Sequence, residues 1–313
     1  MSLKKMGRVI MIWFNLLGKL LHRKPDLCYY ALTTTGSGFY KDVVLVGLLQ
    51  IFGVKTVYHI HNKGIEQEKE NKINNLLYRF VFKNRYVILL SRHLYYDIEP
   101  YVPEDRVYYC ANGIKDYQPS AALVTLPENR PFSILFLSNL MKEKGVFVLL
   151  EACSILKNKA YSFQCDFVGG EGDINEKQFN AYVVEKGLID QVRYLGKRYG
   201  QQKEISFEQS DVFVLPSQRD CFPLVVLEAM QHSLPVISTY EGGIPDIVDV
   251  GNTGLLFPPN DVDALVEKLE FLLSNPALRK QMGVNGRIKY EKNYTLSIFE
   301  QRLLRILQEV INK

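Results

Sequence analysis

Residues 132–257 alternate between short apolar runs and helix-like stretches, and this alternation restricts the fold more than any other feature of the sequence. The apolar runs predict strands buried on both faces, and the patterns between them, such as 145–156 and 222–231, predict helices. This order is typical of a parallel sheet covered by helices on both sides. The predicted strands are 132–137, 163–168, 192–195, 211–215, 235–239 and 253–257.

The first half of the chain shows the same alternation, but it begins on a helix. This helix, predicted at residues 5–22, precedes the first strand. A doubly wound domain usually begins with a strand, so we expect the first strand and loop of this domain to be missing. The predicted strands of this half are 26–31, 55–60, 86–90 and 106–110.

The length of 313 residues is sufficient for two domains. Prolines concentrate at residues 116–131, and the segment 116–130 is therefore predicted to be a linker. We predict one domain at 1–127 and a second at 131–290. The amphipathic helix at 296–313 is expected to pack back on the first domain.

Composition excludes several classes of protein. Apolar residues make up 47% of the chain, which is globular composition, and no uncharged apolar run is long enough to cross a membrane. The five cysteines are scattered and form no C-x-x-C pair, which indicates reduced thiols, a cytosolic chain and no cysteine-bound metal. The glycine patterns of nicotinamide- and ATP-binding loops are missing from the sequence.

Positive charge is concentrated in the first part of the sequence. Residues 1–130 contain 18 Lys and Arg against 11 Asp and Glu, whereas the remainder contains 20 against 23. A basic first domain is suited to an anionic membrane surface or an acidic acceptor. Nucleic acid is the rival partner, but no helix-turn-helix, zinc-finger or aromatic RNA-binding motif supports it.

Two acidic residues lie where ligands bind in an open parallel sheet. Asp220 follows the strand predicted at 211–215, and Glu228 lies in the next predicted helix. An ionised carboxylate accepts hydrogen bonds, and a sugar offers many hydroxyl donors. The alternative is that Asp220 caps the helix and Glu228 is a solvated helical residue.

Six stretches in a fixed order make residues 132–313 resemble the nucleotide-sugar-binding half of the retaining glycosyltransferases of family 4. Residues 26–115 resemble the later part of the acceptor-side domain of that family. The resemblance implies an α/β protein with the GT-B fold, in which two Rossmann-like, doubly wound domains face a cleft, here with an incomplete N-terminal domain. The stretches are 137–145, 168–172, 194–196, 210–217, 222–230 and 241–248.

The resemblance assigns the donor's diphosphate to Lys144, at the start of a helix whose N-terminal amides also favour an anion. The alternative is a solvated surface lysine. Asn139 occupies a position where the family usually has an arginine, so it offers a hydrogen bond but no charge. Gly242 and Gly243 permit close approach of the backbone to a ligand, although a tight turn is an equally simple reason for them.

The remaining donor contacts are also implied by the resemblance. The nucleotide base is expected near residues 196–198, and the sugar and phosphate near the amides of residues 222–224. Pro223 departs from the family's usual glycine and has no N–H to donate. The donor-binding residues implied in this way are Gly170, Gly196, Arg198, Phe222, Pro223 and Leu224.

By the same resemblance, Glu228 holds the ribose hydroxyls and Asp220 contacts the transferred sugar. Asp220 is one methylene shorter than the family's glutamate, so its carboxylate reaches roughly 1.5 Å less. His59 and His61 end a strand on the acceptor side, where the family commonly has a histidine near the sugar. His61 is the first choice for that role because it is nearer the loop, and a structural role is the alternative. The expected catalytic residues are thus Asp220, Lys144 and His61.

These features predict a retaining glycosyltransferase of the hexosyltransferase type, active in polysaccharide biosynthesis of the cell envelope. It would transfer a sugar from a UDP- or GDP-linked donor to a polysaccharide or a lipid-linked oligosaccharide, without a metal or other cofactor. The expected location is the cytoplasm, at the inner face of the cytoplasmic membrane. The alternative is an inactive nucleotide-sugar-binding fragment, or a non-catalytic partner subunit of a membrane polysaccharide synthase.

Overall fold

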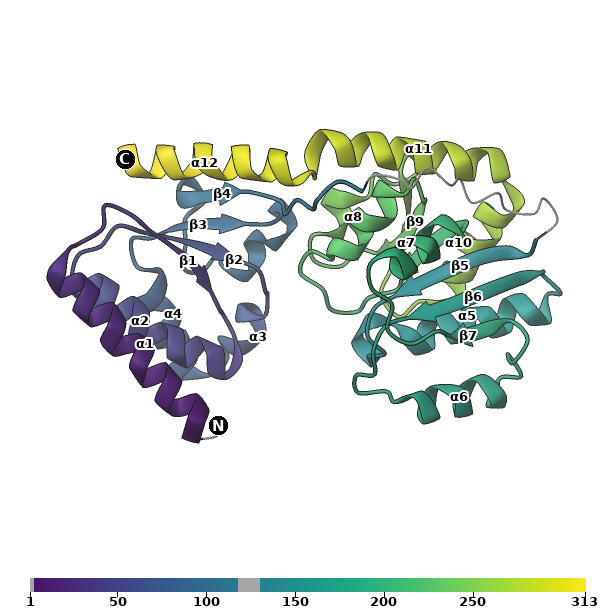
Figure 1. The fold of residues 1–313 in the computed structure, drawn as a ribbon, viewed down its shortest axis with the longest axis horizontal. Coiled ribbons are helices and arrows are strands. Elements are labelled where there is room, and N and C mark those ends of the chain that lie inside the picture. The colour runs from purple at the N-terminus through teal and green to yellow at the C-terminus, as the bar shows by residue number, and fades with distance from the viewer. Residues whose placement is uncertain (1–2, 118–129) are drawn as a thin grey trace. The chain divides into compact units, whose positions relative to one another are not determined.

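The computed structural model describes residues 3–117 and 130–313. The chain forms two compact units (Figure 1). Unit 1 comprises Met1–Ala111 and Phe299–Lys313, and unit 2 comprises Asn112–Ile298. The predicted linker at 116–130 falls largely on residues that lie outside the described ones. Asp116 and Tyr117, at its start, are part of unit 2.

Unit 1 is built on a parallel sheet with the strand order β1-β2-β3-β4. Its strands are β1 Cys28–Leu32, β2 Thr56–Ile60, β3 Tyr86–Leu89 and β4 Val107–Tyr109. Its helices and 3-10 turns are α1 Leu3–His22, α2 Gly36–Ile51, α3 Ile65–Glu68, α4 Lys72–Phe82, η1 Arg92–Asp97, η2 Glu104–Arg106 and most of α12 Leu296–Asn312.

The central strand β2 shows how unit 1 buries both faces of its sheet. Successive side chains of a strand point to opposite faces. Val57 packs in a cluster with Ile306 and Val310 of α12, whereas the neighbouring Tyr58 meets Phe82 of α4 edge-on. Figure 1 accordingly shows α12 along one face of this sheet and α2 and α4 on the other.

Unit 2 contains a parallel sheet with the order β10-β9-β8-β5-β6-β7. Its strands are β5 Phe132–Leu137, β6 Phe163–Val168, β7 Val192–Tyr194, β8 Val212–Leu215, β9 Val236–Thr239 and β10 Gly254–Phe257. Its helices and turns are η3 Lys142–Lys144, α5 Val146–Asn158, α6 Glu176–Glu185, α7 Gln201–Glu208, α8 Leu224–Gln231, α9 Ile244–Ile247, α10 Val262–Ser274 and α11 Pro276–Asn293.

Helices enclose the sheet of unit 2, and this explains its apolar strands. All residues of β8 and β9 are buried, because α5 packs with α10 and α8 packs with α11 on either side of the strands. The predicted fold class, two Rossmann-like α/β units with parallel sheets, is confirmed. The strands predicted at 132–137 and 163–168 have the observed bounds, and the other predicted strands differ from the observed ones by at most two residues at an end.

Candidate functional site

The strand order of unit 2 contains a point where the chain changes direction across the sheet. From β5 the chain proceeds to β6 and β7 on one side, and then returns to β8 on the other side of β5. In open α/β sheets, ligands bind outside the carboxyl ends of the strands at such a switch point. Lys144 lies after β5 and Asp220 lies after β8, so both predicted catalytic residues of this unit stand at that point.

The structure joins Lys144 and Asp220 in an ion pair. Nζ of Lys144 lies 2.6 Å from Oδ2 of Asp220, and the side chains are 21% and 13% exposed. The other carboxylate oxygen of Asp220 accepts a hydrogen bond from the amide of Cys221 at 3.0 Å. Asp220 does not cap α8, whose N-cap residue is Pro223, and Lys144 is not a solvated lysine. The simpler alternatives for these two residues are therefore wrong.

Two glycines allow the loops around this ion pair to approach each other closely. Gly145 has φ of +80°, and a Cβ there would lie 2.0 Å from the carbonyl oxygen of Pro216. Gly242 has φ of +53°, and a Cβ there would lie 2.2 Å from the carbonyl oxygen of Asp220. The turn at Gly242 continues with Gly243, whose amide donates to the carbonyl of Cys221 at 2.8 Å. A side chain at either strained position would push the loops apart.

Asn139 and Gly170 occupy neighbouring loops after β5 and β6. Oδ1 of Asn139 accepts a hydrogen bond from the amide of Gly170 at 3.2 Å. A Cβ at Gly170 would lie 2.3 Å from Cε of Lys197, so a side chain here would displace the end of that lysine. Asn139 therefore fastens one loop to the next.

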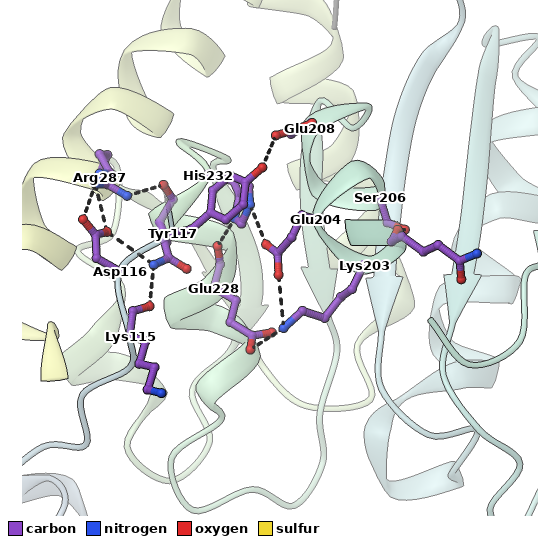
Figure 2. Close-up of polar contacts among 12 residues, drawn as sticks. Lys115, Asp116, Tyr117, Lys203, Glu204, Ser206, Glu208, Glu228, His232 and Arg287 are labelled. Carbon is purple, nitrogen blue, oxygen red and sulfur yellow. Dashed lines mark hydrogen bonds and ion pairs between the residues drawn. The ribbon is translucent and has the colours of Figure 1, made fainter. Parts of the chain in front are cut away.

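Glu228 points from α8 toward Lys203 of α7 (Figure 2). Nζ of Lys203 donates to Oε1 of Glu228 at 2.8 Å, and each side chain is 24% exposed. Glu228 is thus ion-paired, contrary to the alternative of a solvated helical residue. Lys203 was not anticipated from the sequence, because it lies on another helix and no spacing rule relates it to Glu228.

The loop that precedes α7 contains the residues expected near the nucleotide base. Gly196 has φ of +63°, and its carbonyl accepts from the amide of Gly169 at 2.9 Å. Nη1 of Arg198 donates to Oγ of Ser206 at 3.0 Å, which ties the loop to α7.

The segment between β8 and α8 presents a mixture of buried and exposed groups. The Phe222 side chain is 5% exposed and meets Tyr294 edge-on, whereas Leu224 is 43% exposed. Helix α8 begins at Leu224, and the amide of Val226 in its first turn donates to the carbonyl of Pro223 at 3.1 Å. Pro223 precedes the helix at the N-cap and adds no amide.

The two histidines of unit 1 have different surroundings at the end of β2. His59 is 0% exposed, and its Nδ1 lies 2.6 Å from the hydroxyl of Tyr29. Burial, together with the nearby His61, lowers the pKa of His59 to about 3. The buried position of His59 does not fit the predicted contact with an acceptor. Its place in the alternation of β2 turns it inward, toward Phe299 of α12.

His61 lies one residue beyond the end of β2 and is exposed. Its ring contacts that of His59, with centroids 4.1 Å apart. The groups around this ring desolvate it enough to lower the pKa of His61 despite its exposure. Of the two histidines, His61 is the one that a ligand can reach.

Known structures resemble the two parallel-sheet units closely. The Anabaena protein Alr3699/HepE, crystallised with UDP, superposes with a TM-score of 0.80 at 19% identity, over 96% of this chain and 82% of that one. The lipopolysaccharide outer core galactosyltransferase WaaB superposes with a TM-score of 0.76 at 19% identity, over 97% of this chain and 81% of that one. These similarities show that this chain has the GT-B fold.

Residues 124–289, more than half of the chain, match the family model described as glycosyl transferases group 1. The chain belongs to this family. A similar relative is the amylovoran biosynthesis glycosyltransferase AmsK of Erwinia amylovora, 29% identical over 188 residues, which are 58% of this chain and 46% of the relative. The capsular polysaccharide biosynthesis glycosyltransferase CapM of Staphylococcus aureus is 28% identical over 56% of this chain and 45% of its own. The chain spans about half the length of these curated relatives.

Proposed function

We propose that this protein is a retaining glycosyltransferase that binds a nucleotide-sugar in unit 2 and transfers its sugar to a polysaccharide or lipid-linked oligosaccharide. The observation that carries the proposal is the Lys144–Asp220 pair at the switch point between β5 and β8. Membership of the glycosyl transferases group 1 family supports it. The names of similar proteins involved in amylovoran and capsule synthesis favour a polysaccharide product.

In this proposal, Lys144 stabilises the diphosphate as it leaves the sugar. Lys144 directly precedes Gly145, the N-cap of α5, and the first amides of a helix favour an anion. Preorganised positive charge of this kind lowers the barrier without needing to be rearranged during the reaction. No cofactor besides the donor substrate is required by this scheme.

Asp220 is proposed to hold the hydroxyls of the transferred sugar. Its Oδ2 contacts the ammonium group of Lys144 at 2.6 Å, and a carboxylate has further lone pairs that can accept hydrogen bonds from sugar hydroxyls. A diphosphate that reaches Lys144 would share the ammonium group with Asp220, which places the sugar and the phosphate next to each other. Asp220 is assigned to binding of the donor and not to a double displacement at the sugar.

Glu228 is proposed to accept hydrogen bonds from the ribose, with the base near residues 196–198. The amides of Phe222 and Leu224 would serve the phosphate and sugar, and Pro223 cannot contribute one. His61, the exposed histidine of unit 1, is the proposed contact on the acceptor side. Asn139, Gly170, Gly242 and Gly243 shape the loops that surround the donor.

A screen of UDP- and GDP-sugars for donor hydrolysis and transfer tests this function. We expect consumption of one donor class, and a large loss of kcat/KM in Asp220→Ala. An unchanged kcat/KM in that variant would overturn the role of Asp220. Nucleotide binding without any transfer would favour the second candidate, an inactive nucleotide-sugar-binding fragment. The absence of nucleotide binding at millimolar concentration would favour a non-catalytic partner subunit of a membrane synthase.

We also propose that α1 contacts an anionic membrane surface from the cytoplasmic side. On this helix, Met11, Phe14 and Leu21 are 57%, 68% and 70% exposed, and Lys19 lies among them in the sequence. A groove of about 1070 Å³ runs beside Phe14, Lys19 and Arg23. Apolar and basic residues on one helix suit the boundary between head groups and acyl chains. None of the described helices is long and apolar enough to span a bilayer.

Vesicle sedimentation tests this contact with the full chain. Binding to vesicles with phosphatidylserine should exceed binding to neutral vesicles, fall with added salt and fall further in Phe14→Ser. Binding that is indifferent to lipid charge and to salt would contradict the proposal.

A further inference from the structure

Lys203 lies between two carboxylates of unit 2. Its Nζ is 2.8 Å from Oε1 of Glu228 and 3.7 Å from Oε1 of Glu204. All three side chains are between 19% and 24% exposed. Charges at this depth interact more strongly than on an open surface, so the two carboxylates would repel each other without the lysine.

We propose that Lys203 is a positioning residue, which holds the Glu228 carboxylate where it can accept hydrogen bonds from the ribose hydroxyls of the donor. This inference rests on the proposed function, because it concerns the same nucleotide site. The bond to Lys203 uses one lone pair of Oε1, so Glu228 keeps the capacity to accept from two hydroxyls. An unpaired glutamate would sample several rotamers and lose entropy on binding.

Glu204, the second carboxylate beside Lys203, lies close to the ring of His232. Nε2 of His232 lies 2.9 Å from Oε2 of Glu204. Nδ1 of the same ring lies 2.8 Å from the carbonyl oxygen of Glu228, which can only accept, so Nδ1 donates. The ring of His232 thus lies between the backbone carbonyl of Glu228 and the carboxylate of Glu204 (Figure 2).

Two aromatic rings fix the imidazole of His232 between them. The ring of Tyr117 stacks on it with a centroid distance of 4.6 Å, and the ring of Phe207 stacks with 4.8 Å. The hydroxyl of Tyr117 donates to Oε1 of Glu208 at 2.7 Å, at the far end of α7. Helix α7 therefore contacts α8 through the Lys203–Glu228 pair, and its far end contacts Tyr117 and the His232 ring at the C-cap of α8.

Lys203 and the loop at 196–198 contact different parts of the proposed nucleotide site, so their effects on binding can be measured separately. The Arg198–Ser206 hydrogen bond connects the base-side loop to α7, whereas Lys203 alone of these residues touches the carboxylate of Glu228. A displacement of the whole helix α7 would weaken binding of the base, the ribose and the phosphates together. A loss of the Lys203 ammonium group should weaken recognition of the ribose.

The test measures selectivity for ribose over deoxyribose. Dissociation constants of UDP, GDP and their 2′-deoxy counterparts are measured by titration calorimetry for the full chain. A hydrogen bond to a charged group corresponds to roughly tenfold in affinity, so the wild type should prefer the ribonucleotide by about that factor. Lys203→Met should lose most of this preference, as should Glu228→Gln, and Lys203→Arg should recover it.

Lys159→Met is the matched control. It breaks another lysine–glutamate pair of unit 2, Lys159–Glu270 at 2.7 Å, and should leave the preference unchanged. Partial unfolding of a variant would scale both dissociation constants equally, so the ratio reports on the site itself.

Each outcome decides the matter. Weaker binding by Lys203→Met with an unchanged ribose preference would show a merely structural role and overturn the inference. Wild-type binding without any ribose preference would also overturn it, and the donor site would still stand. If the wild type bound neither UDP nor GDP, the proposed function itself would fail.

Discussion

The carboxyl ends of the strands differ between the two units. In unit 2, the ends of β5 and β8 present Lys144 and Asp220 as an ion pair, beside glycines at positive φ. In unit 1, the end of β2 presents one buried and one exposed histidine. Charged residues in unit 2 follow their strands by several residues and so lie in loops, whereas His59 lies within its strand. The residue within a covered strand is thus buried, whereas the residues in the loops beyond the strands are partly exposed.

The largest effect is expected at Gly145 of unit 2. In Gly145→Ala, the methyl group would meet the Pro216 carbonyl in a backbone conformation that disfavours any side chain, so we expect a destabilisation of at least about 2 kcal/mol. Thermal unfolding followed by circular dichroism measures it. Gly18→Ala in helix α1 is the control, since a Cβ there meets nothing within 4 Å and alanine should stabilise by about 0.5–1 kcal/mol. An equal change in unfolding free energy in the two variants would contradict the proposed close approach of the loops at Gly145.

The next effect concerns the charge at the switch point. Lys144→Met removes the proposed partner of the leaving diphosphate, and we expect kcat/KM for donor consumption to fall by roughly 100-fold, as when one preorganised donor is lost. The matched control, Lys289→Met, removes a lysine of unit 2 that pairs with Asp249 and should retain activity. Comparable activity in the two variants would show that the charge of Lys144 is dispensable.

Because the pKa of His59 is lowered in the folded state, we expect the stability of unit 1 to depend on pH. The folded state keeps this residue neutral, with a pKa of about 3, whereas an unfolded histidine has a pKa of about 6.5. The unfolded state therefore binds an extra proton below about pH 6.5, and stability falls as the pH falls toward 3. At pH 5 this penalty amounts to about 2 kcal/mol. His59→Gln, which can still accept from Tyr29, should flatten this part of the profile in urea unfolding curves.

A wild-type and a His59→Gln profile with the same slope between pH 6.5 and 5 would refute the buried neutral state.

The smallest effect is expected at His61. Because its ring is exposed, His61→Gln should change stability by no more than about 0.5 kcal/mol. Its proposed acceptor contact should instead appear as a loss of transfer of about tenfold with nucleotide affinity unchanged, in line with one lost hydrogen bond. Transfer kinetics together with UDP or GDP titration distinguish a contact with the acceptor from a contact with the donor. A loss of nucleotide affinity would place His61 at the donor.

The fold could be predicted from the sequence because the apolar strands and helical patterns repeat without interruption. The ends of the strands also predicted that Lys144 and Asp220 lie close together, since loop residues after parallel strands gather at one edge. The partner of Glu228 could not be predicted. Lys203 meets Glu228 through the packing of α7 on α8, and the distance in sequence gives no indication of it.

His59 illustrates a second limit. It lies within a strand whose two faces are both covered, by α12 on one side and by α4 on the other. All five residues of β2 are buried, so a polar residue in this strand has no exposed face to occupy. The covering helix α12 comes from the opposite end of the chain, and its contact with β2 cannot be read from the local pattern.

Hydrogen–deuterium exchange of the full chain with and without UDP or GDP tests the central claim, that unit 2 holds the donor at the ends of β5 and β8. We predict slower exchange of amides at 138–146 and 217–230 when the nucleotide is bound. Protection confined to unit 1, or no change in these two loops at a saturating nucleotide concentration, would contradict the account.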